Sequence, residues 1–284
     1  MNNYDRIPPI RRARGYRLYT EGGVRYLDLW QQDGRAICGH APARVRRAFE
    51  NTLARGQGGV LPGRWRVRLE RALTVMTGAP GPWTLFASAE AAHMALDRVY
   101  GRAGWALADP VDERRESGVS GVEMVALFRP LLSTPESNRA DPLLVQVPVM
   151  VGSGVYALWR PDAADPQSPV VSALPGMGQP PAEPVLAAAT RAAYDVIEQL
   201  PGLRSEERAC ARVLAAFDRS RSWRRRGLYL RSLLGTDDYR RLFTRFLEAN
   251  VVLSPEAGGV SIVPRVMSDG EQALVIRLIG ETEA

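Results

Sequence analysis

The pattern of apolar and polar residues predicts strands and helices along the whole chain. Residues 14–56 carry β-type residues on both sides of Gly22-Gly23, which predicts a hairpin, and the positions after Pro42 have helical spacing. The final helix has a capping box, Ser268 with Glu271. Further helices are predicted at 64–76, 88–100, 185–200, 205–217 and from 236 to 246, and further strands at 83–86, 103–108, 122–128, 143–151, 251–253 and 260–263.

Proline content marks the main interruption of this pattern. Residues 161–184 hold seven prolines, so this span is predicted to be a long loop covering a shortened sheet. The chain is expected to be α/β, a sheet with helices around it. We expect an N-terminal arm and part of a small domain at 1–56, a shortened large sheet domain at 57–184, and a connecting helix with a C-terminal α+β unit at 185–284.

Composition narrows the chemistry that the chain can perform. Its 284 residues contain 37 basic side chains, all of them arginine, so a mechanism that needs a lysine amine is excluded. The formal charge of +6 is therefore a permanent arginine charge. Two cysteines and two histidines, His40 and His93, lie far apart in the sequence, which predicts neither a disulfide framework nor a metal site.

Hydropathy argues against a membrane protein. No apolar run approaches the roughly 20 residues that span a bilayer, and the first residues lack the apolar segment of a signal peptide. The expected location is the cytoplasm.

One basic run stands out, residues 219–226, which place five arginines around Trp223. Such a run could contact phosphates while Trp223 stacks on a base. The favoured interpretation is a solvated helix end or loop with Trp223 packed against the body of the protein, because one short cluster does not make a groove that follows a nucleic acid.

Three stretches contain motifs in a consistent order. Residues 85–100 place Ser88-Ala89-Glu90 in a turn between a strand and a helix, and 239–274 place a Gly-Val strand between two helices. A further helix pattern covers 183–200. The opening stretch contains Gly15, Gly22-Gly23, Tyr26-Leu27-Asp28 and Gly39-His40-Ala41-Pro42.

Together these stretches resemble class III, fold-type I pyridoxal-phosphate-dependent aminotransferases, and glutamate-1-semialdehyde aminomutase fits best. The resemblance is good at both chain ends and poor between residues 105 and 181. It implies an abbreviated fold-type I large domain, an α+β small domain formed by both ends of the chain, and a dimer. It also implies that Ser88, Ala89 and Glu90 are a degenerate phosphate-binding turn, because the family has a Ser-Gly-Thr-Glu-Ala motif there.

The departures from the family bear on activity. The family holds its cofactor on a lysine, expected here near residues 174–178, where the sequence has none. Neither Asp109 nor the Asp112-Glu113 pair has the setting of the carboxylate that pairs with the pyridinium nitrogen. We therefore expect no catalytic residues of the family's kind and no covalently held cofactor, with non-covalent pyridoxal phosphate or a phosphate anion left open.

These observations support a non-catalytic, aminotransferase-like partner subunit, either a homodimer or a heterodimer with an active paralogue. A second hypothesis is an enzyme with a remodelled, lysine-free cleft that uses Ser88, Glu90, His93 or Asp109. It requires His93 to face a carboxylate within hydrogen-bond reach. A third is an arginine-rich binder of nucleic acid or an acidic partner through residues 219–226, which the sequence favours least.

Overall fold

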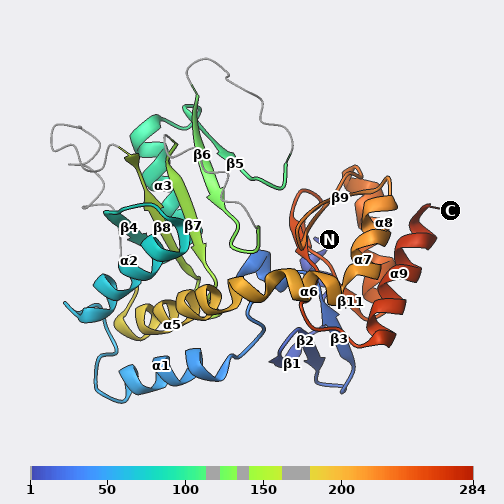
Figure 1. Ribbon diagram of the computed structural model, residues 1–284, viewed down its shortest axis with the longest axis horizontal. Helices are drawn as coiled ribbons and strands as arrows, with labels where there is room; N and C mark the ends of the chain where they lie inside the picture. The colour runs from blue at the N-terminus through green and yellow to red at the C-terminus, as the bar shows by residue number, and fades with distance from the viewer. Residues whose placement is uncertain (1, 113–121, 133–140, 162–179, 284) are drawn as a thin grey trace. The chain divides into compact units, whose positions relative to one another are not determined.

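The computed structural model describes residues 2–112, 122–132, 141–161 and 180–283 (Figure 1). The chain forms two compact units: Met1–Pro42, Leu131–Ser133 and Leu200–Ala284 make the first, and Ala43–Pro130 with Thr134–Gln199 the second. This division differs from the predicted boundaries at 56/57 and 184/185. The cause is that the helix after Pro42 and the helix from Glu183 pack against each other within the second unit.

The first unit is built from both chain ends around two small sheets. The opening hairpin is present as predicted, but the segment expected to be an extended arm is a third strand, because its backbone pairs with the hairpin. One sheet has the order β1-β2-β3-β11, with β11 parallel to β3, and the other has the order β12-β10-β9. The strands are β1 (Ile10–Arg14), β2 (Arg17–Thr20), β3 (Arg25–Asp28), β9 (Trp223–Arg226), β10 (Tyr229–Ser232), β11 (Val251–Val252) and β12 (Val260–Ile262).

Helices complete the first unit and bury large apolar side chains. The predicted helix at 205–217 is two helices, which meet at the buried Cys210. Tyr229, Tyr239, Phe217, Phe243 and Phe246 are fully buried. The helices are α6 (Leu203–Ala209), α7 (Ala211–Arg219), α8 (Thr236–Glu248) and α9 (Asp269–Glu283), with short 3-10 turns at Tyr4–Arg6, Gln31–Gly34 and Leu200–Gly202.

The second unit holds a five-stranded sheet of order β4-β8-β7-β6-β5. The predicted strand at 83–86 is present with the same bounds, those predicted at 103–108, 122–128 and 143–151 are present with shorter bounds, and a fifth strand, β8, was not predicted. Buried Phe86, Val125, Leu144 and Leu158 form a core with α3. The strands are β4 (Trp83–Phe86), β5 (Trp105–Ala108), β6 (Glu123–Phe128), β7 (Leu143–Val147) and β8 (Val155–Trp159).

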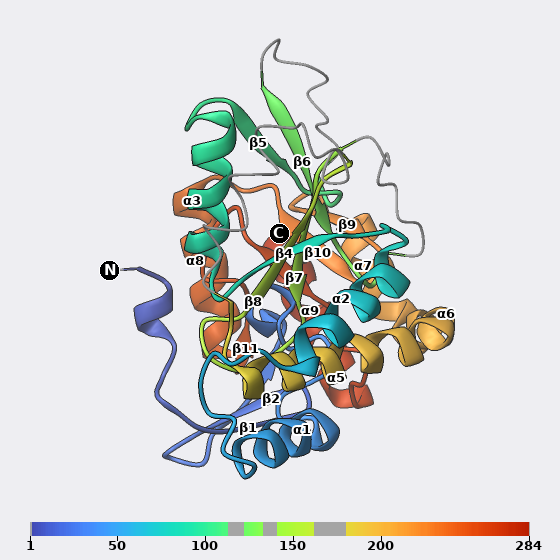
Figure 2. The same cartoon turned by 90° about the vertical axis from the view of Figure 1, so that its left-hand side faces the viewer.

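Helices α1 (Ala43–Leu53), α2 (Arg64–Thr77), α3 (Ala89–Tyr100) and α5 (Glu183–Gln199) surround this sheet. Figure 2 shows α5 between α1 and α2, and α5 contacts both. The alanine-rich face of α5 allows this close approach, since its alanines from Ala187 to Ala193 are fully buried. Most of the predicted proline-rich loop, 162–179, lies outside the described residues. None of the helices in the described part of the chain is long and apolar enough to cross a membrane.

Candidate functional site

The carboxyl ends of the parallel strands lie at one edge of the five-stranded sheet. β5, β6 and β7 are parallel, and β4 runs in the same direction because β4 and β7 are both antiparallel to β8. In open α/β sheets, ligands bind at the edge where the carboxyl ends of the strands meet. Ser88, Asp109 and Arg129 follow β4, β5 and β6, so this edge is the candidate site.

The turn after β4 has the predicted strand–turn–helix form. Ser88 is the N-cap of α3, and its Oγ accepts a hydrogen bond from the Ala91 N–H at 3.2 Å. The Glu90 carboxylate accepts hydrogen bonds from its own N–H and from the Ser88 hydroxyl, and these bonds lower the pKa of Glu90. Ser88, Ala89 and Glu90 therefore do lie together at a helix N-terminus. The positive end of α3 already interacts with an anion of the chain itself.

Asp109 and Arg129 form a buried, bidentate ion pair at the same edge. Arg129 donates from Nη2 to Asp109 Oδ2 at 2.5 Å and from Nε to Oδ1 at 3.2 Å. Both side chains are less than a tenth exposed, and Asp109 Oδ1 also accepts the Val111 N–H. Because its lone pairs are engaged in this way, Asp109 is held by the protein's own groups and is a poor free base.

His93 lies on the exposed side of α3. Its ring is 5.4 Å from that of Trp105, and it is close enough to Glu90 to lower the pKa of that carboxyl. Within the described residues His93 has no hydrogen bond to a carboxylate. The arrangement that the remodelled-cleft hypothesis requires is therefore not present there.

The opening motif forms a buried polar pair in the first unit. Asp28 Oδ2 lies 2.7 Å from His40 Nε2, and both side chains are almost fully buried. Asp28 Oδ1 accepts the N–H groups of Trp30 and Gln31, each at 2.9 Å. His40 is isolated in the sequence, but in the structure it is a buried partner of Asp28. Proximity across a 12-residue turn is not visible in a local pattern.

Glycine is required where this motif closes on itself. His40 and Gly15 exchange backbone hydrogen bonds, and Gly39, at φ +81°, lies so close to the Gly15 backbone that a Cβ would be 3.1 Å from Gly15 Cα. The preceding turn is also unusual, since Gln31, Gln32 and Asp33 all have positive φ. The two hydrogen bonds that Asp28 accepts support this left-handed turn, which L residues rarely adopt.

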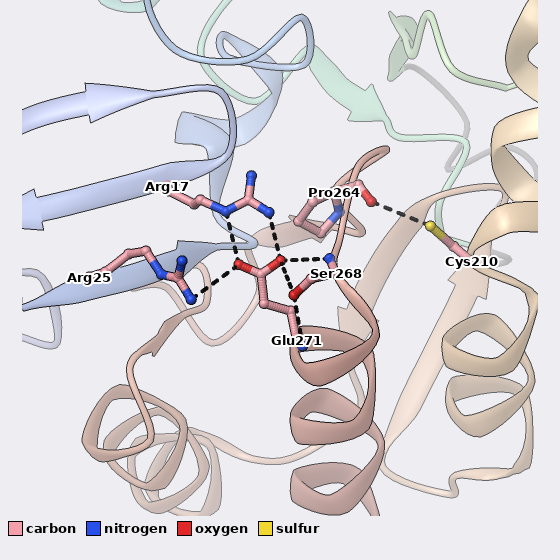
Figure 3. A network of polar contacts seen from close by, with 6 residues as sticks. All are labelled: Arg17, Arg25, Cys210, Pro264, Ser268 and Glu271. Carbon is pink, nitrogen blue, oxygen red and sulfur yellow. Dashed lines mark hydrogen bonds and ion pairs between the residues drawn. The ribbon is translucent and has the colours of Figure 1, made fainter.

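The predicted capping box near the C-terminal end also contacts a strand from the N-terminal end of the chain (Figure 3). Glu271 accepts from the Ser268 N–H at 2.8 Å, and its own N–H donates to Ser268 Oγ at 3.3 Å. Arg17 on β2 also donates to the two Glu271 oxygens at 2.9 and 2.6 Å. Burial raises the pKa of Glu271, but the hydrogen bonds from Arg17 and Ser268 outweigh burial, so this pKa lies below its ordinary value.

Part of the basic run at 219–226 serves structure. Trp223 is 4% exposed and its ring packs edge-on against Phe217, which confirms that it packs against the body of the protein. The predicted helix end or loop is present at 219–222, where α7 ends at Arg219, whereas 223–226 form strand β9 because they pair with β10. Arg225 binds Asp218 with two hydrogen bonds of 2.7 Å and donates to the Gly227 carbonyl.

The residues present do not fit a covalently held pyridoxal phosphate. The chain has no lysine, the α3 N-terminus interacts with Glu90, and Asp109 is bound to Arg129. The segment 174–178, where the lysine was expected, lies outside the described residues. In the part of the chain that the structure describes, no group of three or more His, Cys, Asp or Glu side chains could hold a metal ion.

Sequence comparison links the chain to proteins of unknown function. No protein-family model matches it. An uncharacterized protein of Treponema pallidum is 28% identical over 91% of this chain and 90% of its own length. An uncharacterized protein of Borreliella burgdorferi is 42% identical over 52 residues, 18% of this chain and 19% of that protein.

Structural comparison shows the fold. Ornithine aminotransferase from Toxoplasma gondii superposes with a TM-score of 0.68 at 16% identity, covering 96% of this chain and 89% of that one. Ornithine δ-aminotransferase of Plasmodium falciparum gives 0.66 at 13% identity, with 96% and 93% covered. Acetylornithine aminotransferase from Elizabethkingia anophelis gives 0.60 at 12% identity, with the same coverage. The chain therefore has the α/β fold of these aminotransferases, as the sequence resemblance predicted.

Proposed function

We propose that this chain is a degenerate aminotransferase-like protein, similar to glutamate-1-semialdehyde aminomutase, that lacks transaminase activity and acts as a partner subunit in a dimer. The observation that carries the proposal is the absence of lysine from all 284 residues of a chain with the aminotransferase fold. Without that amine, the family's covalent step has no nucleophile.

The carboxyl edge of the sheet supports the same conclusion. Its charged groups are already engaged by other groups of the chain: Glu90 by the Ser88 hydroxyl, and Asp109 by Arg129. A group already engaged in the resting protein must give up those bonds before it can bind a ligand, which opposes binding. The candidate site therefore favours structure over catalysis.

A second surface supports the partner role. Between the end of α1 and the first turn of α2, four apolar side chains are at least 49% exposed: Leu53, Val60, Leu61 and Val67. Contiguous exposed apolar groups mark interaction surfaces, and these four are close together in the sequence. We call these four residues the apolar stretch, and we assign it to the dimer contact.

Two residues of the apolar stretch, Val60 and Leu61, lie on a loop that Glu183 holds on both sides of them. The Gly59 carbonyl accepts the Glu183 N–H at 3.1 Å. The Glu183 carboxylate accepts the Trp65 N–H and lies against Gly63 so closely that a Cβ there would overlap it. Burial raises the pKa of Glu183, whose side chain is fully enclosed. Because the loop is held in this way, Val60 and Leu61 are presented without the cost of ordering them on binding.

The activity part of the proposal is tested with pyridoxal phosphate and borohydride. Reduction should add no mass to the chain except at its N-terminal amine, which peptide mapping distinguishes from an internal site. An active aminotransferase treated in parallel is the positive control. An internal adduct would overturn this part of the proposal.

The partner part is tested by light scattering after size exclusion. The wild-type chain should be a dimer, or should form a mixed dimer when co-expressed with a lysine-bearing aminotransferase of the same organism. Val60→Asp with Leu61→Asp should abolish the dimer, while Val266→Asp, at an equally exposed apolar residue of the first unit, should not. A monomer in both the single and the mixed preparation would contradict the proposal.

A further inference from the structure

Arginine side chains without partners lie on the N-terminal sheet. The side chains of Arg11 and Arg14 on β1 have no hydrogen-bond or ion-pair partner among the described residues, whereas Arg225 on β9 is fully engaged. β1 is exposed along almost its whole length. A short strand this rich in arginine and this exposed calls for an explanation beyond folding.

The strand register places four arginines and one tyrosine on the same face. Residues directly opposite in an antiparallel ladder point to the same side of the sheet. Arg14 lies opposite Arg17, and in the next row Tyr19 lies opposite Arg12 on one side and Arg25 on the other. We call these five residues the arginine face.

The arginine face carries more positive charge than the protein neutralises. Within the described residues Glu271 is the carboxylate that reaches it, bonded to Arg17 and 4.0 Å from Arg25 (Figure 3). Arg12 lies over the Tyr19 ring at 5.8 Å. Like charges directly opposite each other, as at Arg14 and Arg17, destabilise a sheet, so a bound anion would stabilise this one.

The composition of the face indicates which anion it binds. Protein interfaces are anchored by apolar and aromatic groups in buried pockets, and the two flanking exposed apolar residues, Ile10 and Val24, make no such anchor. Strand addition to β1 is disfavoured by the bulge between Ile10 and Arg12, a feature that distorts sheet edges. Cations beside an accessible aromatic ring are the combination that binds single-stranded nucleic acid.

We propose that the arginine face binds single-stranded nucleic acid. Arg12, Arg14 and Arg25 contact phosphates, and a base stacks on Tyr19 in the position that the Arg12 guanidinium occupies in the free protein. The proposal does not rest on the dimer contact: the arginine face belongs to the first unit and the apolar stretch to the second.

The test is fluorescence anisotropy of the full chain with a labelled single-stranded RNA of about 16 nucleotides. In the first variant, Arg12, Arg14 and Arg25 are each changed to Gln. In the matched control, Arg55, Arg71 and Arg212 are changed to Gln; these are exposed, and the described structure gives them no partner. The slope of log K against log salt should fall by about 2 in the first variant, since each phosphate contact contributes about 0.7. The control should keep the wild-type slope.

Tyr19 separates base stacking from charge. Tyr19→Ala should weaken binding about fivefold or more, while Tyr19→Phe, which keeps the ring, should bind like the wild type. Glu271→Gln, which removes the competing carboxylate, should strengthen binding severalfold. Thermal melts identify any variant that fails to fold, and the Phe and Gln variants test the proposal even if Tyr19→Ala does not fold.

Three results would overturn the proposal. One is the absence of salt-dependent binding by the wild type. Another is an equal loss of slope in the control triple variant, which would indicate general attraction to a basic protein. The third is competition by polyglutamate as effective as that by RNA at equal charge, with Tyr19→Ala unchanged, which would assign the face to an acidic protein segment.

Discussion

Two of the buried carboxylates, Asp28 and Asp109, lie in contrasting surroundings. In the first unit, Asp28 lies within the family-like motif, is paired with His40 and supports a left-handed turn. In the second unit, Asp109 lies at the edge where α/β proteins bind ligands, yet it is bound to Arg129. The first keeps the residues of its motif, whereas around the second the motif residues have changed. This contrast is what the proposed function predicts: the frame is kept, while the groups at the sheet edge are bonded to one another.

Removing Asp28 from its buried pair with His40 should have the largest effect on stability. Asp28→Ala leaves His40 and two N–H groups without their partner in the core, and removing one member of a buried pair costs about 3 to 5 kcal/mol. Native-state hydrogen exchange of peptides within residues 16–42 measures this loss. Asp28→Asn, which retains one acceptor oxygen, should cost less. Equal exchange rates in Asp28→Ala and wild type would show that the pair does not hold the frame.

The edge pair should behave differently when both partners are replaced. Asp109→Ala alone should cost about 3 to 5 kcal/mol, because it leaves Arg129 buried without its carboxylate. The double change Asp109→Leu with Arg129→Met should be near neutral or stabilising, since an apolar pair of similar size avoids the desolvation of two charges. Urea denaturation of the wild type, Asp109→Ala and the double variant measures their free energies of unfolding. A double variant as unstable as the single one would indicate a further role for these charges.

The link between the chain ends should depend on pH. Glu271→Gln should cost about 1.5 to 3 kcal/mol at neutral pH, the range for hydrogen bonds to charged groups. Because the folded pKa of Glu271 lies below the ordinary value of about 4.3, its contribution is fully present above that value and is lost as pH falls through the folded pKa. Denaturation measured from pH 7 to 3 should show a smaller decline for Glu271→Gln. Parallel curves would refute the assignment.

The smallest effect is expected at the degenerate phosphate turn. Ser88→Ala removes the N-cap of α3 and should cost about 1 kcal/mol, the usual value for a cap. Adding inorganic phosphate should not raise the melting temperature of the wild type, because Glu90 already interacts with this helix end. Stabilisation by phosphate that disappears in Ser88→Ala would instead show a working anion site.

Local sequence patterns predicted most of the helices and strands, but not the side-chain pairs between distant segments that stabilise them. The Ser268–Glu271 capping box and the strand–turn–helix around Ser88 were visible because their residues interact within one turn. Leu53 fits the helical spacing of Val45 and Thr52, yet it is 50% exposed while they are buried, since helical spacing does not say which flank of a helix meets a neighbour.

Contacts between distant segments could not be predicted in the same way. The Asp109–Arg129 and Arg17–Glu271 pairs join residues 20 and 254 positions apart. The sequence predicts only an N-terminal arm where β1 lies, because the arginines of β1 hide the alternation of a buried strand and only pairing with β2 defines it.

The central claim is that the aminotransferase fold persists here without the aminotransferase reaction. The most direct test is the rate at which an amino acid converts pyridoxal phosphate to pyridoxamine phosphate, measured with and without the protein over a panel of amino donors. We predict the same rate in both cases. A rate that rises in proportion to protein concentration, and that is lost when Asp109 or Arg129 is changed, would contradict this claim.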